Sequence, residues 1–447
     1  MLPLPIGQTT DYDQRFHLSP AAQMRHTAIF GKSGTGKSTL MRNMIAWDIS
    51  EGEGLALADP HGDLVDDLLG MIPRYRTNDV IYFKPDDPER VPGINPLRRV
   101  SHDQKPLVVS SIISILKNIW KDFWGPQTEY ILSNLVAALL EQKKPVTFLA
   151  LLKALVDDDY REYLNRSVSD PTVAVFFQLY TEEWDDRFRT EASAPLMNKI
   201  GKLIGNPLLR AVIGQPTSSF DFRRAMDTRK TLLCDLSKGV LGADVSSLLG
   251  SLIVSSISLA ALSRKAVPEK QRVPFKLYAD EVHNFIHGVD FPTLLSEARK
   301  YKLSVVAATQ TIAQLPQDSA SALFGNCATL ISFRVGGQDA EILNLEFAKT
   351  VSPSQLQELP DHRIYVRTLT PLNNKSSATT PGGPQLVNTF PPLRVTGNEN
   401  TPDRVIRASK QRYGRPRARI EERHQAFFSR QLDGDPSENS NRRRQAP

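Results

Sequence analysis

Short apolar runs alternate with helical apolar spacing over the first hundred residues. His26–Phe30, Leu55–Ala58 and Val80–Phe83 each predict a short buried strand, because each is a brief apolar segment bounded by polar or turn residues. Between them, Ser38–Ile49 and Leu64–Met71 carry apolar residues at helical spacing. Strands that alternate with helices are typical of an open, mostly parallel α/β sheet.

The pattern changes in the middle of the chain. From Gln104 to Ile213 apolar residues recur at helical spacing without a convincing strand, which predicts an inserted all-α domain. Strand-like runs then return, at Thr231–Asp235, Phe275–Ala279, Leu303–Ala308 and Ala328–Phe333. The α/β domain is therefore expected to be split around the insertion.

These changes predict four segments. Residues 1–103 and 216–370 form the two parts of the α/β domain, and residues 104–215 form the insertion. After Pro371 the composition turns to Pro, Gly, Ser, Thr and Asn, which predicts a flexible tail over 371–447 with one helix near Ile420–Phe428.

The basic excess is confined to that tail. The 447-residue chain has a net charge of +6, and residues 401–447 contain twelve Arg or Lys against six Asp or Glu. The tail therefore suggests an anionic partner, with nucleic acid as the first candidate. A solvated, disordered tail is the alternative.

The two cysteines, Cys234 and Cys327, are expected to be buried free thiols in a reducing compartment. The first residues lack the features of a signal peptide, so a cytoplasmic location is predicted. Val245–Ser263 is uncharged and close to membrane-spanning length, but it contains seven serines, which favours a buried core helix and no stable membrane insertion.

A phosphate-binding motif follows the first strand. Gly31–Thr39 has the sequence G-K-S-G-T-G-K-S-T between a predicted strand and a predicted helix, which is the context of a P-loop. Backbone N–H groups at a helix N-terminus favour anions, so ATP is the expected ligand. Lys37 would contact the β- and γ-phosphates, Ser38 would bind Mg2+, and Thr39 would lie near the α-phosphate. The predicted nucleotide-binding residues are Gly31, Lys32, Ser33, Gly34, Thr35, Gly36, Lys37, Ser38 and Thr39.

Hydrolysis also needs acidic residues. Phe275–Ala279 is followed by Asp280 and Glu281, which is the form of a Walker B motif. Asp280 would hold the magnesium ion through water, and Glu281 would polarise the attacking water. An Asp-Glu pair after a strand is by itself more often a helix start, but the P-loop favours the catalytic interpretation.

Two further residues are candidates for the catalytic set. Gln310 follows the strand Leu303–Ala308 and could sense the γ-phosphate, although such a glutamine is more often a turn residue. Arg299 lies in a helical segment just before that strand and could stabilise transition-state charge in a neighbouring subunit's site. An arginine paired with a surface glutamate is the alternative.

Several classes of P-loop protein are excluded by their missing motifs. The guanine motif N-K-x-D of GTPases fails at Asn198–Gly201, where the final Asp is absent. The signature of ABC transporters must precede Walker B, but Gly336–Gln338 follows it. A two-lobed helicase needs a second motor lobe, and too few residues follow Asp280 to form one.

Together the motifs resemble the HerA/FtsK superfamily, specifically the TraD/TraG-like coupling ATPases of type IV secretion and their soluble HerA-like relatives. The resemblance covers about residue 5 to residue 370, and several shared motifs carry it. They are H-x-x-I-x-G-K-S-G-x-G-K-S-T at His26–Thr39, D-P-H-G-D at Asp59–Asp63, I-N-P-L at Ile94–Leu97, Asp280-Glu281, R-K-Y at Arg299–Tyr301, A-T-Q at Ala308–Gln310, Asn326, and F-R-V-G at Phe333–Gly336.

The resemblance implies a RecA-like motor domain with an all-α insertion, and a hexameric ring of identical subunits around DNA. It also implies that Arg299 is the arginine that acts in trans, with Arg334 as the second candidate. Lys302 stands where this family usually has glycine. Membrane-anchored relatives carry N-terminal transmembrane helices that this sequence does not show.

These observations predict an ATP-driven DNA-translocating motor in conjugative, type IV secretion-like transfer, with a relaxase or secretion-channel proteins as further partners. One alternative is a HerA-like helicase or translocase in repair or end processing, which would need a nuclease partner. An alternative of another class is a nucleotide-gated scaffold that binds DNA–protein substrates without translocating.

Overall fold

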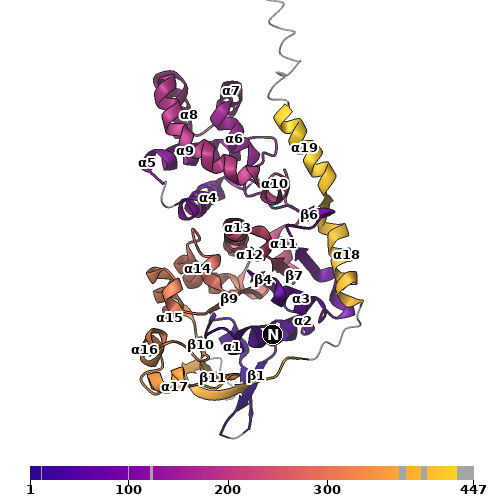
Figure 1. The fold of residues 1–447 in the computed structure, drawn as a ribbon, viewed down its shortest axis with the longest axis vertical. Helices are drawn as coiled ribbons and strands as arrows, with labels where there is room; N and C mark the ends of the chain where they lie inside the picture. The colour runs from indigo at the N-terminus through magenta and orange to yellow at the C-terminus, as the bar shows by residue number, and fades with distance from the viewer. Residues whose placement is uncertain (12, 99, 121–123, 372–378, 394–399, 430–447) are drawn as a thin grey trace, which may run out of the picture. The chain divides into compact units, whose positions relative to one another are not determined.

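The computed structural model describes residues 1–11, 13–98, 100–120, 124–371, 379–393 and 400–429. The chain divides into two compact units (Figure 1). The first contains Met1–Lys84 and Phe220–Arg412, and the second contains Pro85–Ser219 and the residues from Tyr413 onward. The predicted insertion began at residue 104 and ended at residue 215, whereas the second unit begins at Pro85, ends at Ser219 and takes in a C-terminal helix.

An 11-stranded sheet forms the centre of the first unit, in the order β2-β1-β14-β11-β10-β3-β9-β8-β4-β7-β5. The seven strands from β10 to β5 pair in parallel, and the four beyond them pair antiparallel. This arrangement confirms the predicted α/β class with a mostly parallel sheet. The parallel strands are β3 (Thr27–Phe30), β4 (Gly54–Asp59), β5 (Val80–Phe83), β7 (Thr231–Asp235), β8 (Phe275–Ala279), β9 (Leu303–Thr309) and β10 (Thr329–Ser332).

The antiparallel extension has no counterpart among the predicted strands. It consists of β1 (Leu4–Thr9), β2 (Arg15–Leu18), β11 (Arg363–Arg367) and β14 (Gln385–Thr389). β14 pairs with β1 on one side and with β11 on the other, so it joins the two ends of the chain in one sheet. Two short strands, β12 (Leu369–Pro371) and β13 (Thr379–Pro381), form a separate ribbon.

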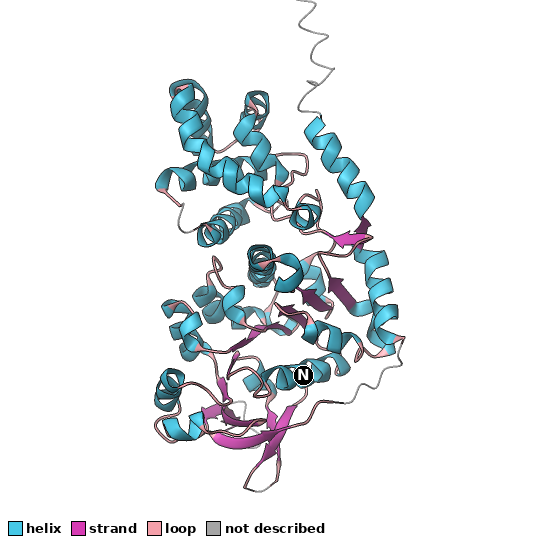
Figure 2. Cartoon of the chain, viewed as in Figure 1, coloured by secondary structure: helices cyan, strands magenta, loops and turns pink. Residues whose placement is uncertain are grey.

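Helices cover the sheet of the first unit (Figure 2). Since parallel strands are joined by right-handed crossovers, a reversal of strand order moves the connecting helix to the other face. The helices are α1 (Pro20–Gln23), α2 (Lys37–Ser50), α3 (Asp63–Leu69), α11 (Phe222–Asp227), α12 (Lys238–Leu241), α13 (Ala243–Leu262), α14 (Phe291–Glu297), α15 (Gln317–Asn326), α16 (Gly337–Glu346), α17 (Pro353–Gln357) and α18 (Thr401–Tyr413).

One apolar cluster unites α2, α3 and a face of the sheet. Leu40, Met44 and Ile45 of α2 pack in it with Leu55 and Leu57 of β4, all nearly inaccessible to solvent. Alternate residues of β4 contribute to this cluster, as expected for a strand whose successive side chains point to opposite faces. The packing fixes the direction of α2, and therefore of the turn that precedes it.

The long apolar helix α13 lies inside the first unit. Among the described residues, Ala243–Ala266 is the single helical stretch long and apolar enough to cross a membrane, and 72% of its most apolar window is buried. Gly250 permits close packing, since a Cβ atom there would lie 2.1 Å from the ring of Phe285. The helix therefore packs as part of the core, as its serine content predicted.

The described residues of the second unit form helices and one short ribbon. Its helices are α4 (Lys105–Ile119), α5 (Pro126–Leu140), α6 (Leu149–Val156), α7 (Asp158–Asn165), α8 (Pro171–Gln178), α9 (Asp186–Gly205), α10 (Pro207–Ile213) and α19 (Arg417–Ser429). The ribbon pairs β6 (Arg90–Pro92) with β15 (Gly414–Pro416). An aromatic chain runs through this unit, from Tyr130 through Phe176 and Tyr180 to Trp184 and Phe188.

The prediction of a flexible tail over 371–447 is wrong for the described part of it. β14, α18 and α19 are regular elements, and α19 includes the helix predicted near Ile420–Phe428. Several of the tail's basic groups serve this structure: Arg412 donates to the carbonyl of Asn78, and Arg417 donates to that of Asp87. Residues 372–378, 394–399 and 430–447 lie outside the described residues.

His26 ties the start of β3 to β9. Its Nδ1 accepts a hydrogen bond from the backbone N–H of Val305 at 2.9 Å, and only 2% of the residue is exposed. Burial lowers the pKa of the imidazole to about 4, the nearby backbone of Leu295 opposes the shift, and the nearby charge of Arg299 adds to it. The folded chain therefore holds this histidine neutral.

A histidine pKa that is lower in the folded state makes the protein lose stability as pH falls. Since the unfolded chain binds the proton first, the contribution is full above about pH 6.5 and is lost toward pH 4. A shift of this size corresponds to about 3 kcal/mol. His26→Asn keeps an acceptor for Val305 and tolerates the positive φ of this position, but it does not titrate.

Chemical denaturation of both proteins at pH 7 and pH 4 measures the effect. The unfolding free energy of the wild type should fall relative to that of His26→Asn by about 3 kcal/mol between these values. An identical pH dependence in the two proteins would contradict a buried neutral histidine.

Candidate nucleotide-binding site

The turn between β3 and α2 has the geometry of an anion-binding loop. Gly34 and Gly36 have φ angles of +77° and +112°, which residues with side chains rarely adopt. Gly36 is also the N-cap of the 14-residue helix α2, whose first N–H groups have no partner within the helix. The turn Gly31–Gly36 and the first residues of α2, Lys37–Thr39, therefore direct backbone donors and a helix N-terminus toward a ligand.

Lys37 is buried beneath this turn. Its ammonium donates hydrogen bonds to the carbonyls of Gly31 and, at 3.4 Å, Lys32. Burial lowers its pKa, while the carboxylates of Glu281 and Asp280 act in the opposite direction. The ammonium thus lies between the loop and the two acidic residues, the position from which a lysine can contact terminal phosphates.

Asp280 and Glu281 follow β8, which is separated from β3 only by β9. Burial raises the pKa of Asp280 to about 6, and the neighbouring charges of Glu281 and Asp59 add to the shift. Glu281 has a φ of +46° and is 5% exposed, and its Oε2 atom has no hydrogen-bond partner among the described residues. His283 Nδ1 lies 3.6 Å from that oxygen.

Two residues at this edge offer the oxygen ligands that Mg2+ prefers. Ser38 and Asp280 line the same cavity of about 180 Å³, and burial has raised the pKa of the Asp280 carboxyl, which a cation would reverse. No cluster of three or more His, Cys, Asp or Glu side chains suited to a metal occurs among the described residues. A hydroxyl and one carboxylate fit magnesium, which keeps water and phosphate oxygens as further ligands.

The same cavity reveals acidic residues that the sequence did not assign to the site. It is also lined by Asp59, His61 and Asp63 of the D-P-H-G-D motif and by Asp67. The Asp59 carboxylate accepts hydrogen bonds from the backbone N–H groups of His61 and Val65, so it positions the start of α3. The position of this motif directly after a buried strand was the available signal.

Gln310 and Arg334 both lie beside the P-loop of their own chain. Gln310 follows β9, whose last carbonyl, that of Thr309, accepts a hydrogen bond from Gly31. The carbonyl of Arg334 accepts one from Lys32, and its guanidinium forms an ion pair with Asp361 at 2.8 Å. Gln310 is thus placed between the loop and the Walker B strand, whereas Arg334 lies on the opposite side.

Arg299 lies at the other end of the parallel strands. It belongs to the 3-10 turn Ala298–Tyr301 that precedes β9, so the seven-residue strand, roughly 20 Å long, separates it from Gln310. Arg299 is exposed, and no ion pair or hydrogen bond of its side chain is found in the part of the chain that the structure describes. It is therefore outside its own nucleotide site and open to a neighbouring molecule.

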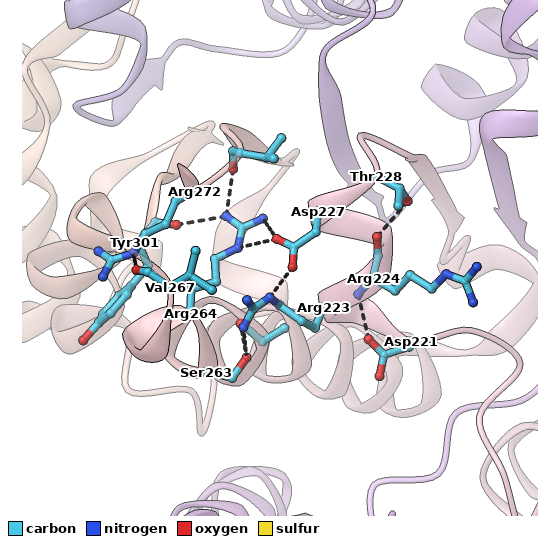
Figure 3. A network of polar contacts seen from close by, with 12 residues as sticks. Asp221, Arg223, Arg224, Asp227, Thr228, Ser263, Arg264, Val267, Arg272 and Tyr301 are labelled. Atoms are coloured by element: carbon cyan, nitrogen blue, oxygen red, sulfur yellow. Dashed lines mark hydrogen bonds and ion pairs between the residues drawn. The ribbon is translucent and has the colours of Figure 1, made fainter. Parts of the chain in front are cut away.

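A network of two arginines holds the turn that carries Arg299 (Figure 3). Arg264, fully buried, donates to the carbonyls of Val273 and Tyr301 at 2.9 Å and pairs with Asp227 at 2.8 Å. Arg272 donates to the carbonyl of Lys300, and its guanidinium lies 5.2 Å from the centre of the Tyr301 ring. The backbone carbonyls of Lys300 and Tyr301, which follow Arg299, are thus each held by an arginine side chain.

Most of the chain matches a known family. A profile described as the type IV secretion-system coupling protein DNA-binding domain matches residues 16–344, almost three quarters of the chain. The chain belongs to this family. The predicted resemblance to coupling ATPases is therefore confirmed. No curated protein sequence matches the chain.

Solved structures show the same fold. The bacterial conjugative coupling protein TrwBdeltaN70 aligns with a TM-score of 0.62 and 19% identity over 85% of this chain and 87% of its own. The plasmid coupling protein TrwB in complex with ADP and Mg2+ aligns with a TM-score of 0.60 and 18% identity over 89% and 97%. VirB4 of Thermoanaerobacter pseudethanolicus gives 0.56 and 14% over 87% and 96%. The RecA-like fold is thereby confirmed.

A buried ion pair joins the helix that follows the P-loop to the Walker B strand of this coupling-protein site. Lys276 of β8 donates to Asp48 of α2 at 2.6 Å, and both side chains are 2% exposed. Tyr278, two residues along the same strand face, donates to the other Asp48 oxygen at 2.6 Å. Lys276 also donates to Gln23 Oε1 at 2.8 Å. The P-loop helix and the Walker B strand are therefore linked by a satisfied polar cluster.

Replacing Lys276 alone should destabilise the protein more than replacing Lys276 and Asp48 together. Lys276→Met leaves Asp48 buried without its cation, and such a loss costs about 3–5 kcal/mol. Adding Asp48→Asn removes the stranded charge and keeps an acceptor for Tyr278, so the double variant should recover part of the loss. The surface change Lys300→Met is the control and should leave the unfolding free energy nearly unchanged.

Denaturant unfolding of the wild type, Lys276→Met, Asp48→Asn, the double variant and Lys300→Met at one pH gives the comparison. Strictly additive losses in the double variant would show that Lys276 and Asp48 do not depend on each other.

Proposed function

We propose that this protein is an ATP-driven motor that moves DNA in conjugative, type IV secretion-like transfer, working as a ring-shaped hexamer of identical subunits. The observation that carries the proposal is the assembly of Lys37, Ser38, Asp280, Glu281 and Gln310 at the carboxyl ends of β3, β8 and β9 in a coupling-protein fold. Binding of ATP and Mg2+ is supported by the chemistry of these residues and by the ADP and Mg2+ complex of TrwB.

The protein's own residues divide the work of hydrolysis. Backbone donors of the P-loop and the Lys37 ammonium would hold the phosphates, and Ser38 and Asp280 would hold the magnesium ion that neutralises their charge. The unpartnered, buried Glu281 oxygen is suited to accept a hydrogen bond from the attacking water. Gln310, between loop and Walker B strand, would contact the γ-phosphate.

The transfer function is favoured over repair by the family match, which describes a DNA-binding domain of type IV secretion coupling proteins. DNA, further copies of the chain, and relaxase or channel proteins are the proposed partners. A scaffold that binds DNA without moving along it needs no catalytic carboxylate. The buried, positioned Glu281 therefore supports a motor.

The first test is ATP hydrolysis by the purified protein with and without DNA. Lys37→Ala and Glu281→Gln should each lower turnover by at least about 100-fold, the former by weakening nucleotide binding and the latter by removing the base. Glu297→Gln, which alters a partly exposed carboxylate that pairs with Lys300, is the control and should hydrolyse ATP normally. DNA should accelerate the wild type; a rate unchanged by DNA is incompatible with a DNA motor.

The second test asks whether Arg299 acts on a neighbouring subunit. Arg299→Ala and Lys37→Ala should each be inactive alone. A mixture of equal amounts should recover about one quarter of wild-type activity, because one quarter of random interfaces join an intact P-loop to an intact arginine. Arg334→Ala, whose residue lies beside its own P-loop, should not be rescued in the same way. A mixture of Arg299→Ala with Lys37→Ala that stays inactive would exclude action in trans.

A further inference from the structure

His362 lies beside the P-loop in a backbone conformation that is unusual for its type. Its φ is +62°, in the left-handed region that favours glycine. Its backbone N–H donates to the carbonyl of Thr35 at 2.9 Å, and its carbonyl accepts from the N–H and hydroxyl of Thr389 at 2.8 and 3.0 Å. Three backbone contacts therefore hold this residue against the loop.

The imidazole of His362 is not used by the fold. It packs against Gly36, where a Cβ atom would lie 2.8 Å from its Nδ1. The residue is exposed, and its ring nitrogens have no hydrogen-bond partner among the described residues. Because glycine would satisfy the same backbone contacts with less strain, the fold does not require a side chain here.

The order of the strands determines which end of a nucleotide faces this histidine. β9 and β8, with Gln310 and Glu281 at their ends, lie on one side of β3, and β10 and β11 lie on the other. The γ-phosphate has to face Glu281 for water to attack it. The nucleoside therefore leaves the loop toward β10 and β11, and His362 immediately precedes β11.

A segment after β14 extends the same wall. Thr389, which bonds His362, begins a stretch held along α2 by Asn43, whose amide donates to Pro391 O at 3.0 Å and accepts from Leu393 N at 3.0 Å. Asn43 lies one helical turn after Thr39, the residue expected at the α-phosphate. The space next to the α-phosphate is thus bordered by His362 and this segment.

We infer that His362 contacts the nucleoside of the bound nucleotide, its sugar or base, and so contributes to affinity for nucleotides but not for phosphate chains alone. The inference rests on the proposed function, since it assumes that the P-loop binds a nucleotide.

Nucleotide binding separates this role from support of the loop. A fluorescent ADP analogue labelled on the sugar, added with Mg2+, reports nucleotide affinity, and tripolyphosphate displacing it reports affinity for phosphates alone. His362→Gly keeps the positive φ and the backbone contacts but removes the ring. His362→Asn, which tolerates this φ and keeps a polar side chain, is the intermediate variant. His17→Gly, an exposed histidine on β2, is the control.

His362→Gly should bind the ADP analogue about tenfold more weakly than the wild type. Its dissociation constant for tripolyphosphate, calculated from the displacement with the variant's own affinity for the analogue, should equal that of the wild type. His362→Asn should fall between them, and His17→Gly should match the wild type. Equal nucleotide affinity in His362→Gly and the wild type overturns the inference alone, as does an equal loss for tripolyphosphate. A wild type that does not bind the analogue overturns the proposed function together with the inference.

Discussion

The buried contact between Lys276 and Asp48 is the constraint on which the site depends. A charge at a 2% exposed position is tolerated only when its partner and hydrogen bonds are in place, and here Asp48 receives both Lys276 and Tyr278. One partner lies on the strand that Asp280 and Glu281 follow, and the other on the helix that begins at Lys37. A change in the separation of these two elements would leave a charge unpaired, so the distance between phosphate loop and carboxylates is coupled to the stability of the fold.

The parallel half of the sheet could be predicted from the sequence because its strands are buried on both faces. Such strands appear as continuous apolar runs, and β5, β7 and β8 were placed at their observed bounds. The antiparallel strands are less regular. β11 begins and ends with arginine, and β14 lies in a segment rich in polar and turn residues, so neither carries a clear apolar run. Their pairing with β1 is a long-range contact that no local pattern contains.

Some residues of the candidate site could likewise be predicted from the sequence, and others could not. Residues within motifs, such as Lys37 and Asp280, could be found because their spacing along the chain reflects local geometry. Lys276 interrupts an otherwise apolar strand, but its partner lies 228 positions earlier. His362 carries no motif at all, and its place beside Gly36 follows only from the antiparallel return of β11 onto β10. Functional residues that lie in one local motif can be predicted from the sequence, whereas residues that distant strands bring together cannot.

Because of the ribbon formed by β6 and β15, the helical unit is not a simple insertion with two junctions. Because β15 pairs with β6 and α19 belongs to the same unit, the chain passes between the two units three times, after Lys84, after Ser219 and after Arg412. An insertion with two junctions can be exchanged between related proteins as one cassette. With a third junction, a transplanted helical unit that lacks the residues after Arg412 would carry an unpaired strand at β6. Recombination within this family is therefore expected to move the helical segment and the C-terminal helix together, or to lose both.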